Sequence, residues 1–199
     1  MTRSRDIANS TSTLDVDGGT IKLDGNYPVG TANVALGDTA LDDGSLSGGY
    51  NTAVGAGSLS ANTSGQQNAS FGAYSLDTNT TGSYNAGFGQ SSLGSNTTGS
   101  YNTSLGRGTL SSNTTASGNS AVGYNALTAN TTGEFNTGLG REALEANTTA
   151  NDNTAVGFRA LTSNTTGATN VAVGREALGS NTTASENTAV GYAALGANT

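Results

Sequence analysis

The sequence predicts an all-β protein, a parallel β-solenoid (β-roll) of about ten 17-residue coils. Three observations predict this fold. An Asn-led motif recurs ten times at a fixed interval, glycine punctuates every repeat, and large apolar residues are scarce. The chain of 199 residues contains 30 glycines, and only 33% of its residues are hydrophobic. An ordinary globular core needs more apolar bulk than this, whereas stacked repeats share one thin core along their length.

Each repeat begins at an Asn, which we number position zero. The first interval is 18 residues and every later interval is 17. These residues are Asn33, Asn51, Asn68, Asn85, Asn102, Asn119, Asn136, Asn153, Asn170 and Asn187. A period of 17 is too short for a helix-turn-helix repeat, which needs more than about 30 residues. Asn and Gly punctuation suits short strands and tight turns. The repeat domain therefore spans residues 33–199.

Four columns of the repeat predict how a coil is built. Position four is always Gly, position eight is always Leu, position two is always small, and position three is a larger apolar residue. Residues alternate between faces along Thr52-Ala53-Val54. We expect Val54 and its column mates to point inward and Ala53 to point to the opposite face. Gly at position four supplies a positive φ at a corner, and Leu59 is a second inward anchor.

Asn also recurs at position eleven in nine coils, from Asn62 to Asn198, and Thr follows each time. The first coil departs from this pattern, with Gly44 at that position. Stacked at the strand spacing of about 4.8 Å, the Asn amides are expected to form hydrogen-bonded ladders. The eight Asn-x-Ser/Thr sequences at position eleven, from Asn62 to Asn181, are explained by this turn rather than by glycosylation.

The low apolar content of each coil favours an oligomer. Two large apolar side chains per coil bury little surface against the entropy of ordering 17 residues. We expect a parallel homotrimer of three thin solenoids, with the small position-two residues allowing close approach. A monomer held together by stacked Asn and Thr is the alternative.

Position five alternates between Arg and an aromatic residue in the later coils. This position-five stripe consists of Arg107, Tyr124, Arg141, Phe158, Arg175 and Tyr192. Position fourteen alternates between Ala and Gly in step with it. The favoured interpretation is a cation–π stack that stabilises the surface of the coils. The alternative is a binding stripe for sugars or for a protein partner.

Residues 1–32 form a separate attachment or capping segment. Thr13–Val16 and Thr20–Leu23 flank Asp17-Gly18-Gly19, which predicts a β-hairpin. Asp15 and Asp17 also resemble the start of a calcium loop, but the distant Glu of that motif is missing, so the turn is favoured. Tyr27-Pro28 marks the junction with the repeats, because Pro interrupts a strand ladder.

Composition excludes several functional classes. The chain has no His, Cys or Trp, so we expect no disulfide, no Ser-His-Asp or Cys-His catalysis, no cofactor and no metal site of the usual kind. A net charge of −7 argues against nucleic-acid binding, and no apolar run long enough for membrane insertion occurs. Glu142, Glu145 and Glu176 stand singly, so we expect no enzyme.

The repeats resemble two families. Asn-Thr-Ala-Val-Gly at 51–55 resembles the Asn-Ser-Val-Ala-Ile-Gly motif of trimeric autotransporter adhesin heads, although it is one residue shorter and its period is longer. The likeness covers residues 33–199, and it implies a left-handed parallel β-roll that trimerises. The stretch 187–195 resembles repeats of bacteriophage tail fibres and appendages. Residues 2–9 resemble the opening segment of phage fibre proteins, near the virion attachment end.

These resemblances imply a structural virion protein, a shaft or fibre appendage that contributes to host attachment. The implied partners are two further copies in a homotrimer, a neighbouring virion protein at residues 1–32, and a host surface receptor. The implied location is the virion, assembled in the host cytoplasm. A bacterial adhesin head needs an export signal and a membrane anchor, and the sequence contains neither, so the phage is preferred. The alternatives are such an adhesin head, or an ice-binding or other soluble β-solenoid.

Overall fold

The computed structural model describes residues 13–15, 22–24 and 32–197. Strands β1 (Thr13–Asp15) and β2 (Lys22–Asp24) pair antiparallel, with Leu14 opposite Leu23. This confirms the pairing expected of the hairpin. The predicted turn at Asp17-Gly18-Gly19 and the Tyr27-Pro28 junction lie outside the described residues.

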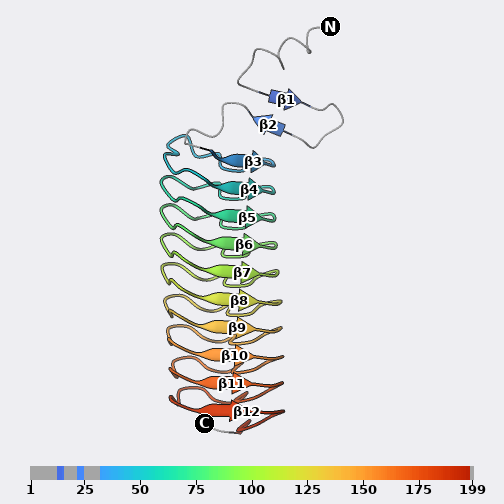
Figure 1. Cartoon of the computed structure of the whole chain (residues 1–199), viewed down its shortest axis with the longest axis vertical. Coiled ribbons are helices and arrows are strands. Elements are labelled where there is room, and N and C mark those ends of the chain that lie inside the picture. The colour runs from blue at the N-terminus through green and yellow to red at the C-terminus, as the bar shows by residue number, and fades with distance from the viewer. Residues whose placement is uncertain (1–12, 16–21, 25–31, 198–199) are drawn as a thin grey trace.

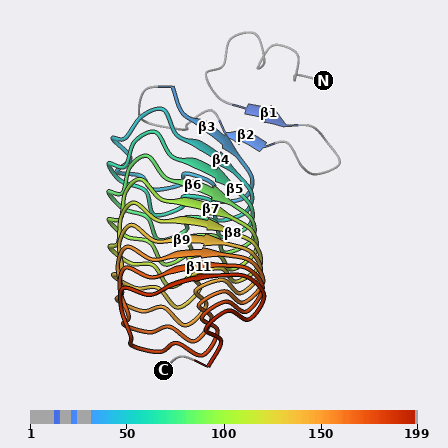
Figure 2. The same ribbon diagram turned by 60° about the horizontal axis from the view of Figure 1, so that its bottom comes forward.

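The repeats form one ten-stranded parallel sheet with one strand per coil. The strands are β3 (Val34–Leu36), β4 (Thr52–Val54), β5 (Ala69–Phe71), β6 (Ala86–Phe88), β7 (Thr103–Leu105), β8 (Ser120–Val122), β9 (Thr137–Leu139), β10 (Thr154–Val156), β11 (Val171–Val173) and β12 (Thr188–Val190). Each strand pairs with its sequence neighbours in register. The coils stack directly over one another (Figures 1 and 2). The predicted parallel β-solenoid is confirmed.

Each strand ends at the position-four glycine, where the chain bends. Gly55 has a φ of +130°, and its counterparts from Gly37 to Gly191 lie in the same region. A Cβ on Gly55 would lie 2.6 Å from the carbonyl carbon of Gly72 in the next coil. Glycine is therefore required both by the backbone conformation and by the closeness of the next coil, as the sequence predicted for the conformation.

The position-eight leucines form the centre of the core. Nine of them, from Leu41 to Leu178, are fully buried. All ten adopt a positive φ between 49° and 54°, which is uncommon for a residue with a branched side chain. Their burial was predicted. Their left-handed backbone was not, because the sequence contains no Gly or Asn at this position to signal it.

The predicted orientation of the strands is wrong. Position two points inward and position three points outward: Ala53, Ala121 and Ala155 have no exposed surface, whereas Phe71 is 38% exposed. From the second coil to the ninth, the interior already contains one Leu and two Asn, so only a side chain of one or two heavy atoms fits at position two. The small position-two residues therefore line the interior and do not provide a surface for close approach between chains.

Two Asn ladders run through the interior, as predicted. At position eleven, the Asn79 amide donates to Asn62 Oδ1 at 2.9 Å. At position zero, the Asn68 amide and backbone N–H both donate to Asn51 Oδ1. Within one coil the two ladders meet, because Asn68 and Asn79 both donate to the carbonyl of Gly82. Among the described residues, every buried side-chain polar atom has a hydrogen-bond partner.

The first coil closes the position-eleven ladder with an apolar side chain. Leu46 is buried, and its N–H bonds three residues back to Asp43, as that of Asn62 bonds to Leu59. The next residue, Ser47, bonds to Thr63 as Thr63 bonds to Thr80. Leu46 lies five residues after Leu41, whereas Asn62 lies three after Leu59, so two extra residues precede Leu46. The turn that follows is one residue shorter, because the Gly48 carbonyl accepts from Asn33 as that of Gly65 accepts from Asn51. Leu46, and not Gly44, occupies the place of the Asn.

Replacing Asn130 by Ala should destabilise the protein by roughly 1–3 kcal/mol, because it leaves buried groups with fewer partners. Asn130 donates to Asn113 Oδ1 and to the Gly133 carbonyl, and it accepts from Asn147. Urea unfolding measures the change. The exposed Asn151→Ala variant, which removes one exposed hydrogen bond, is the control. An unchanged midpoint for Asn130→Ala would contradict a stabilising interior ladder.

Candidate functional site

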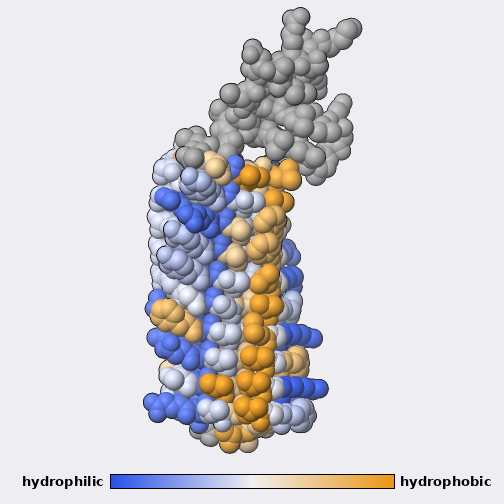
Figure 3. Space-filling model, viewed as in Figure 1, coloured by the Kyte–Doolittle hydropathy of each residue, from blue (hydrophilic) through white to orange (hydrophobic). Residues whose placement is uncertain are grey.

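A continuous column of apolar side chains lies on the outside of the sheet. This position-three column consists of Leu36, Val54, Phe71, Phe88, Leu105, Val122, Leu139, Val156, Val173 and Val190. Six of its members are more than one third exposed. Figure 3 shows it as an orange stripe along the length of the coils. Within it, the rings of Phe71 and Phe88 stack with centroids 4.9 Å apart.

A second ridge on the surface is aromatic, and it lies at the residue just before position zero. Tyr84 and Tyr101 stack there with centroids 4.9 Å apart and planes 3° apart, and Tyr50 and Phe135 are exposed in the same column. This ridge was not predicted from the sequence. The 17-residue period alone was a sufficient signal, because in-register coils place equal positions above one another.

The position-five stripe lies just beyond the bend at position four, and its side chains stack as predicted. The guanidinium of Arg141 lies 5.8 Å from the ring centroid of Tyr124 and 5.6 Å from that of Phe158. Arg107 lies over the other side of the stripe's first ring, Tyr124, at 5.8 Å. Arg175 contacts both Phe158 and Tyr192. Because both faces of Tyr124 and Phe158 are near guanidiniums, these rings are not open platforms for a sugar.

Acidic residues at the neighbouring position six form ion pairs with the arginines of the stripe and with Arg159. Glu142 is 7% exposed and pairs with Arg141 and Arg159, with 2.8 Å contacts to each. The hydrogen bond from Arg141, reinforced by the charges of both arginines, lowers the pKa of Glu142 below its ordinary value. Two coils further on, Glu176 pairs with Arg175 at 3.2 Å. These two glutamates were expected to stand singly. That expectation is wrong: each pairs with the Arg that precedes it in sequence, and Glu142 also pairs with Arg159 at position six of the next coil.

The stack should stabilise the protein modestly. Replacing Arg141 by Ala removes two exposed cation–π contacts, each worth about 0.5–1 kcal/mol. Chemical unfolding should therefore show a loss of about 1–2 kcal/mol, including the weakened ion pair. Thr132→Ala, on an exposed column outside the stripe, should change little. Equal stability of the Arg141→Ala variant and the parent would refute a stabilising stack.

The Glu142 ion pairs should make stability depend on acid pH. Because the pKa of Glu142 is lower in the folded state than in the unfolded state, ionisation of Glu142 favours folding. This contribution is complete above the ordinary Glu pKa, and it disappears as the pH falls through the lowered value. Unfolding the parent and Glu142→Gln between neutral and strongly acidic pH measures it. The difference in the free energy of unfolding between the parent and Glu142→Gln should be largest at neutral pH and should become smaller as the pH falls. A difference that does not change with pH would contradict a stabilising role of ionised Glu142.

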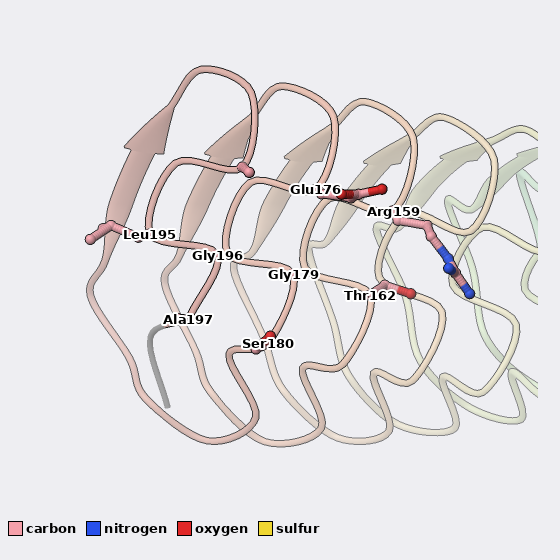
Figure 4. Close-up of a pocket in the computed structure, with 9 residues that line it drawn as sticks. Arg159, Thr162, Glu176, Gly179, Ser180, Leu195, Gly196 and Ala197 are labelled. Carbon is pink, nitrogen blue, oxygen red and sulfur yellow. The ribbon is translucent and has the colours of Figure 1, made fainter.

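An open groove of about 840 Å³ lies across the last three coils. Figure 4 shows Arg159, Thr162, Glu176 and Leu195 among the residues that line it. It forms because Gly179 and the small residues around it leave space between neighbouring columns. Both charged groups of the groove are paired, Arg159 with Glu142 and Glu176 with Arg175. The groove therefore presents no free acid or base to a substrate.

The polar columns of the turns are used structurally. The Asn residues of the eight Asn-x-Ser/Thr sequences at position eleven are fully buried in the ladder, so the folded chain does not present them for glycosylation. At position twelve, Thr80 Oγ1 donates to the carbonyl of Thr97, and Thr97 repeats this with Thr114. Position twelve is half-buried from Thr63 to Thr165, whereas the following position, such as Thr81 and Thr98, is exposed. The turns therefore expose a single column of Thr hydroxyls. An ice-binding solenoid presents a flat face made of more than one such column.

Searches of protein-family models, of curated proteins and of solved structures find no match to the chain. In the part of the chain that the structure describes, no His, Cys, Asp and Glu residues gather into a group that could hold a metal ion. None of the described residues forms a helix long and apolar enough to span a membrane.

Proposed function

We propose that the chain is a non-enzymatic structural protein that forms the shaft or a fibre appendage of a bacteriophage particle and contributes to host attachment. The observation that supports this most directly is the unbroken position-three column on a stiff stack of ten coils. At a spacing of about 4.8 Å, the coils extend for about 45–50 Å. A long stack of coils with a continuous lateral contact surface suits the shaft of a fibre. The resemblance of residues 187–195 and 2–9 to phage fibres supports the same role.

The assembled shaft is a parallel homotrimer in which the three chains contact one another along the position-three column. The column leaves six large apolar side chains more than one third exposed on each chain, and such surface is available for burial in an interface. It is a ridge one side chain wide. Three such ridges that converge on one axis cover each other on both flanks, whereas two opposed ridges leave their flanks in water. The proposed interface is therefore at position three and not at position two, whose side chains line the interior of the coils.

Light scattering tests the trimer. The chain has a mass of 19.5 kDa, so the trimer has a mass of about 58 kDa. Val122→Asp places a charge in the middle of the column and should give monomers, because an unpaired charge is costly to bury. Thr132→Asp, which adds the same charge on an exposed turn column, should remain trimeric. A folded parent of 19.5 kDa would contradict the proposal.

In the virion, residues 1–32 dock the shaft to a neighbouring particle protein, and the solenoid projects toward a host surface receptor. Immunogold labelling with an antibody against the solenoid tests the location. Purified phage particles should be labelled on a fibre or appendage. Labelling of a bacterial surface instead would replace the phage assignment by an adhesin head. Labelling of neither would contradict both.

A further inference from the structure

The cationic side chains of the solenoid gather on one edge. Its four arginines all lie at positions five and six of five successive coils, from the coil that begins at Asn102 to the one that begins at Asn170. They are Arg107, Arg141, Arg159 and Arg175. The ten acidic residues of the solenoid are instead spread over six columns, and the whole chain has a net charge of −7. Only two acids, Glu142 and Glu176, lie beside these arginines, so the edge is net positive on an acidic protein.

The stack holds these guanidiniums in fixed positions. Rings cover their faces, as Tyr124 and Phe158 cover Arg141. The contacts of Arg141 to Glu142 are made by Nε and Nη2, and those of Arg175 to Glu176 use the same two atoms. A guanidinium has five N–H donors, so further donors remain on each side chain. The side chains of Arg141 and Arg175 are 63% and 59% exposed. The donors that remain are therefore preorganised and accessible.

The spacing of the three stripe arginines is regular. Arg107, Arg141 and Arg175 follow each other at 34 residues, which is two coils, or about 9–10 Å at the strand spacing. A planar guanidinium matches the oxygens of a carboxylate or a sulfate. In an extended polysaccharide one sugar is about as long as one strand spacing, so acid groups on alternate sugars match the interval between these arginines.

We propose that this arginine edge binds an anionic polysaccharide that carries carboxylate or sulfate groups. The polymer runs along the coils, parallel to the stack, and its acid groups accept hydrogen bonds from the guanidiniums of Arg107, Arg141 and Arg175. The aromatic rings position the arginines and do not contact the sugar. The edge lies beyond the bend at position four, so it stays accessible beside a contact along the position-three column. The proposal does not depend on the virion location.

The test is binding of the whole chain to polygalacturonate, with dextran as the neutral polymer and single-stranded DNA as a polyphosphate. Biolayer interferometry at low salt should show binding to polygalacturonate, weakened by added salt, and none to dextran. The triple variant Arg107→Gln, Arg141→Gln, Arg175→Gln should bind polygalacturonate with an affinity reduced by a factor of about ten or more. Arg141→Lys keeps the charge and loses the planar fork, so it should bind about threefold more weakly.

A charge-matched control separates the edge from the net charge. Thr81→Glu, Thr115→Glu and Thr149→Glu together lower the net charge by the same three units on the exposed turn column. This variant should bind polygalacturonate nearly as well as the parent. An equal loss in both variants, no binding by the parent, equal binding to dextran, or tighter binding to DNA would each overturn the proposal. Circular dichroism confirms that the variants are folded at the assay temperature.

Discussion

Replacing Gly140 by Ala is expected to destabilise the solenoid by about 3–5 kcal/mol, from backbone strain and overpacking together. Gly140 has a φ of +137°, a region that residues with a Cβ avoid. A Cβ there would lie 2.5 Å from the carbonyl oxygen of Gly157 and 2.7 Å from its carbon. These are backbone atoms of the next coil, and the N–H of Gly157 bonds to Leu139 at 2.8 Å. The coils can make room only by separating.

The control for this variant is Gly191→Ala. Gly191 has nearly the same φ, +130°, but the nearest heavy atom to an added Cβ is 3.9 Å away. It should therefore show the backbone strain alone, about 1–3 kcal/mol. Thermal and urea unfolding of both variants therefore separates the cost of backbone strain from the cost of the contact with the next coil. If both variants lose the same stability, contact between coils adds nothing and strain is the whole effect.

Features were predictable from the sequence where the local structure accepts only one or two residue types. Gly at position four was assigned a positive φ, and Asn62 and its equivalents were assigned to a ladder, because few other residues serve in these places. Arg141 was placed between two rings because in-register coils stack equal positions. These three expectations are confirmed by the geometry.

The orientation of the strand was not predictable in the same way. Ala53 and Val54 are both apolar, so alternation shows that they face opposite sides but not which side is inside. Size favours Val54 as the core residue. The space left inside a coil determines which of the two side chains faces the interior. That space depends on Leu59 and Asn62, which are several residues away in sequence. The pairing of Glu142 with Arg159 was predictable, because both residues are at position six of adjacent coils, but only position five was followed from coil to coil.

The same reasoning predicts a large difference between two leucines that the sequence treats alike. Leu127→Ala should cost about 2–5 kcal/mol, because Leu127 has no exposed surface and truncation leaves a cavity. Leu139, in the position-three column, is 38% exposed. In an isolated chain Leu139→Ala should cost less than about 1 kcal/mol, since little packing is lost.

The comparison also tests where chains meet. If trimers form along the position-three column, Leu139→Ala should reduce stability more at high protein concentration, where the parent gains from association, and it should shift the mass toward monomer. Leu127→Ala should lower stability at every concentration without a specific effect on assembly. Urea unfolding at several protein concentrations, with light scattering at each, distinguishes the two patterns. Equal losses for Leu127→Ala and Leu139→Ala in dilute monomer would mean that position three is packed within the coil and is not available to a partner.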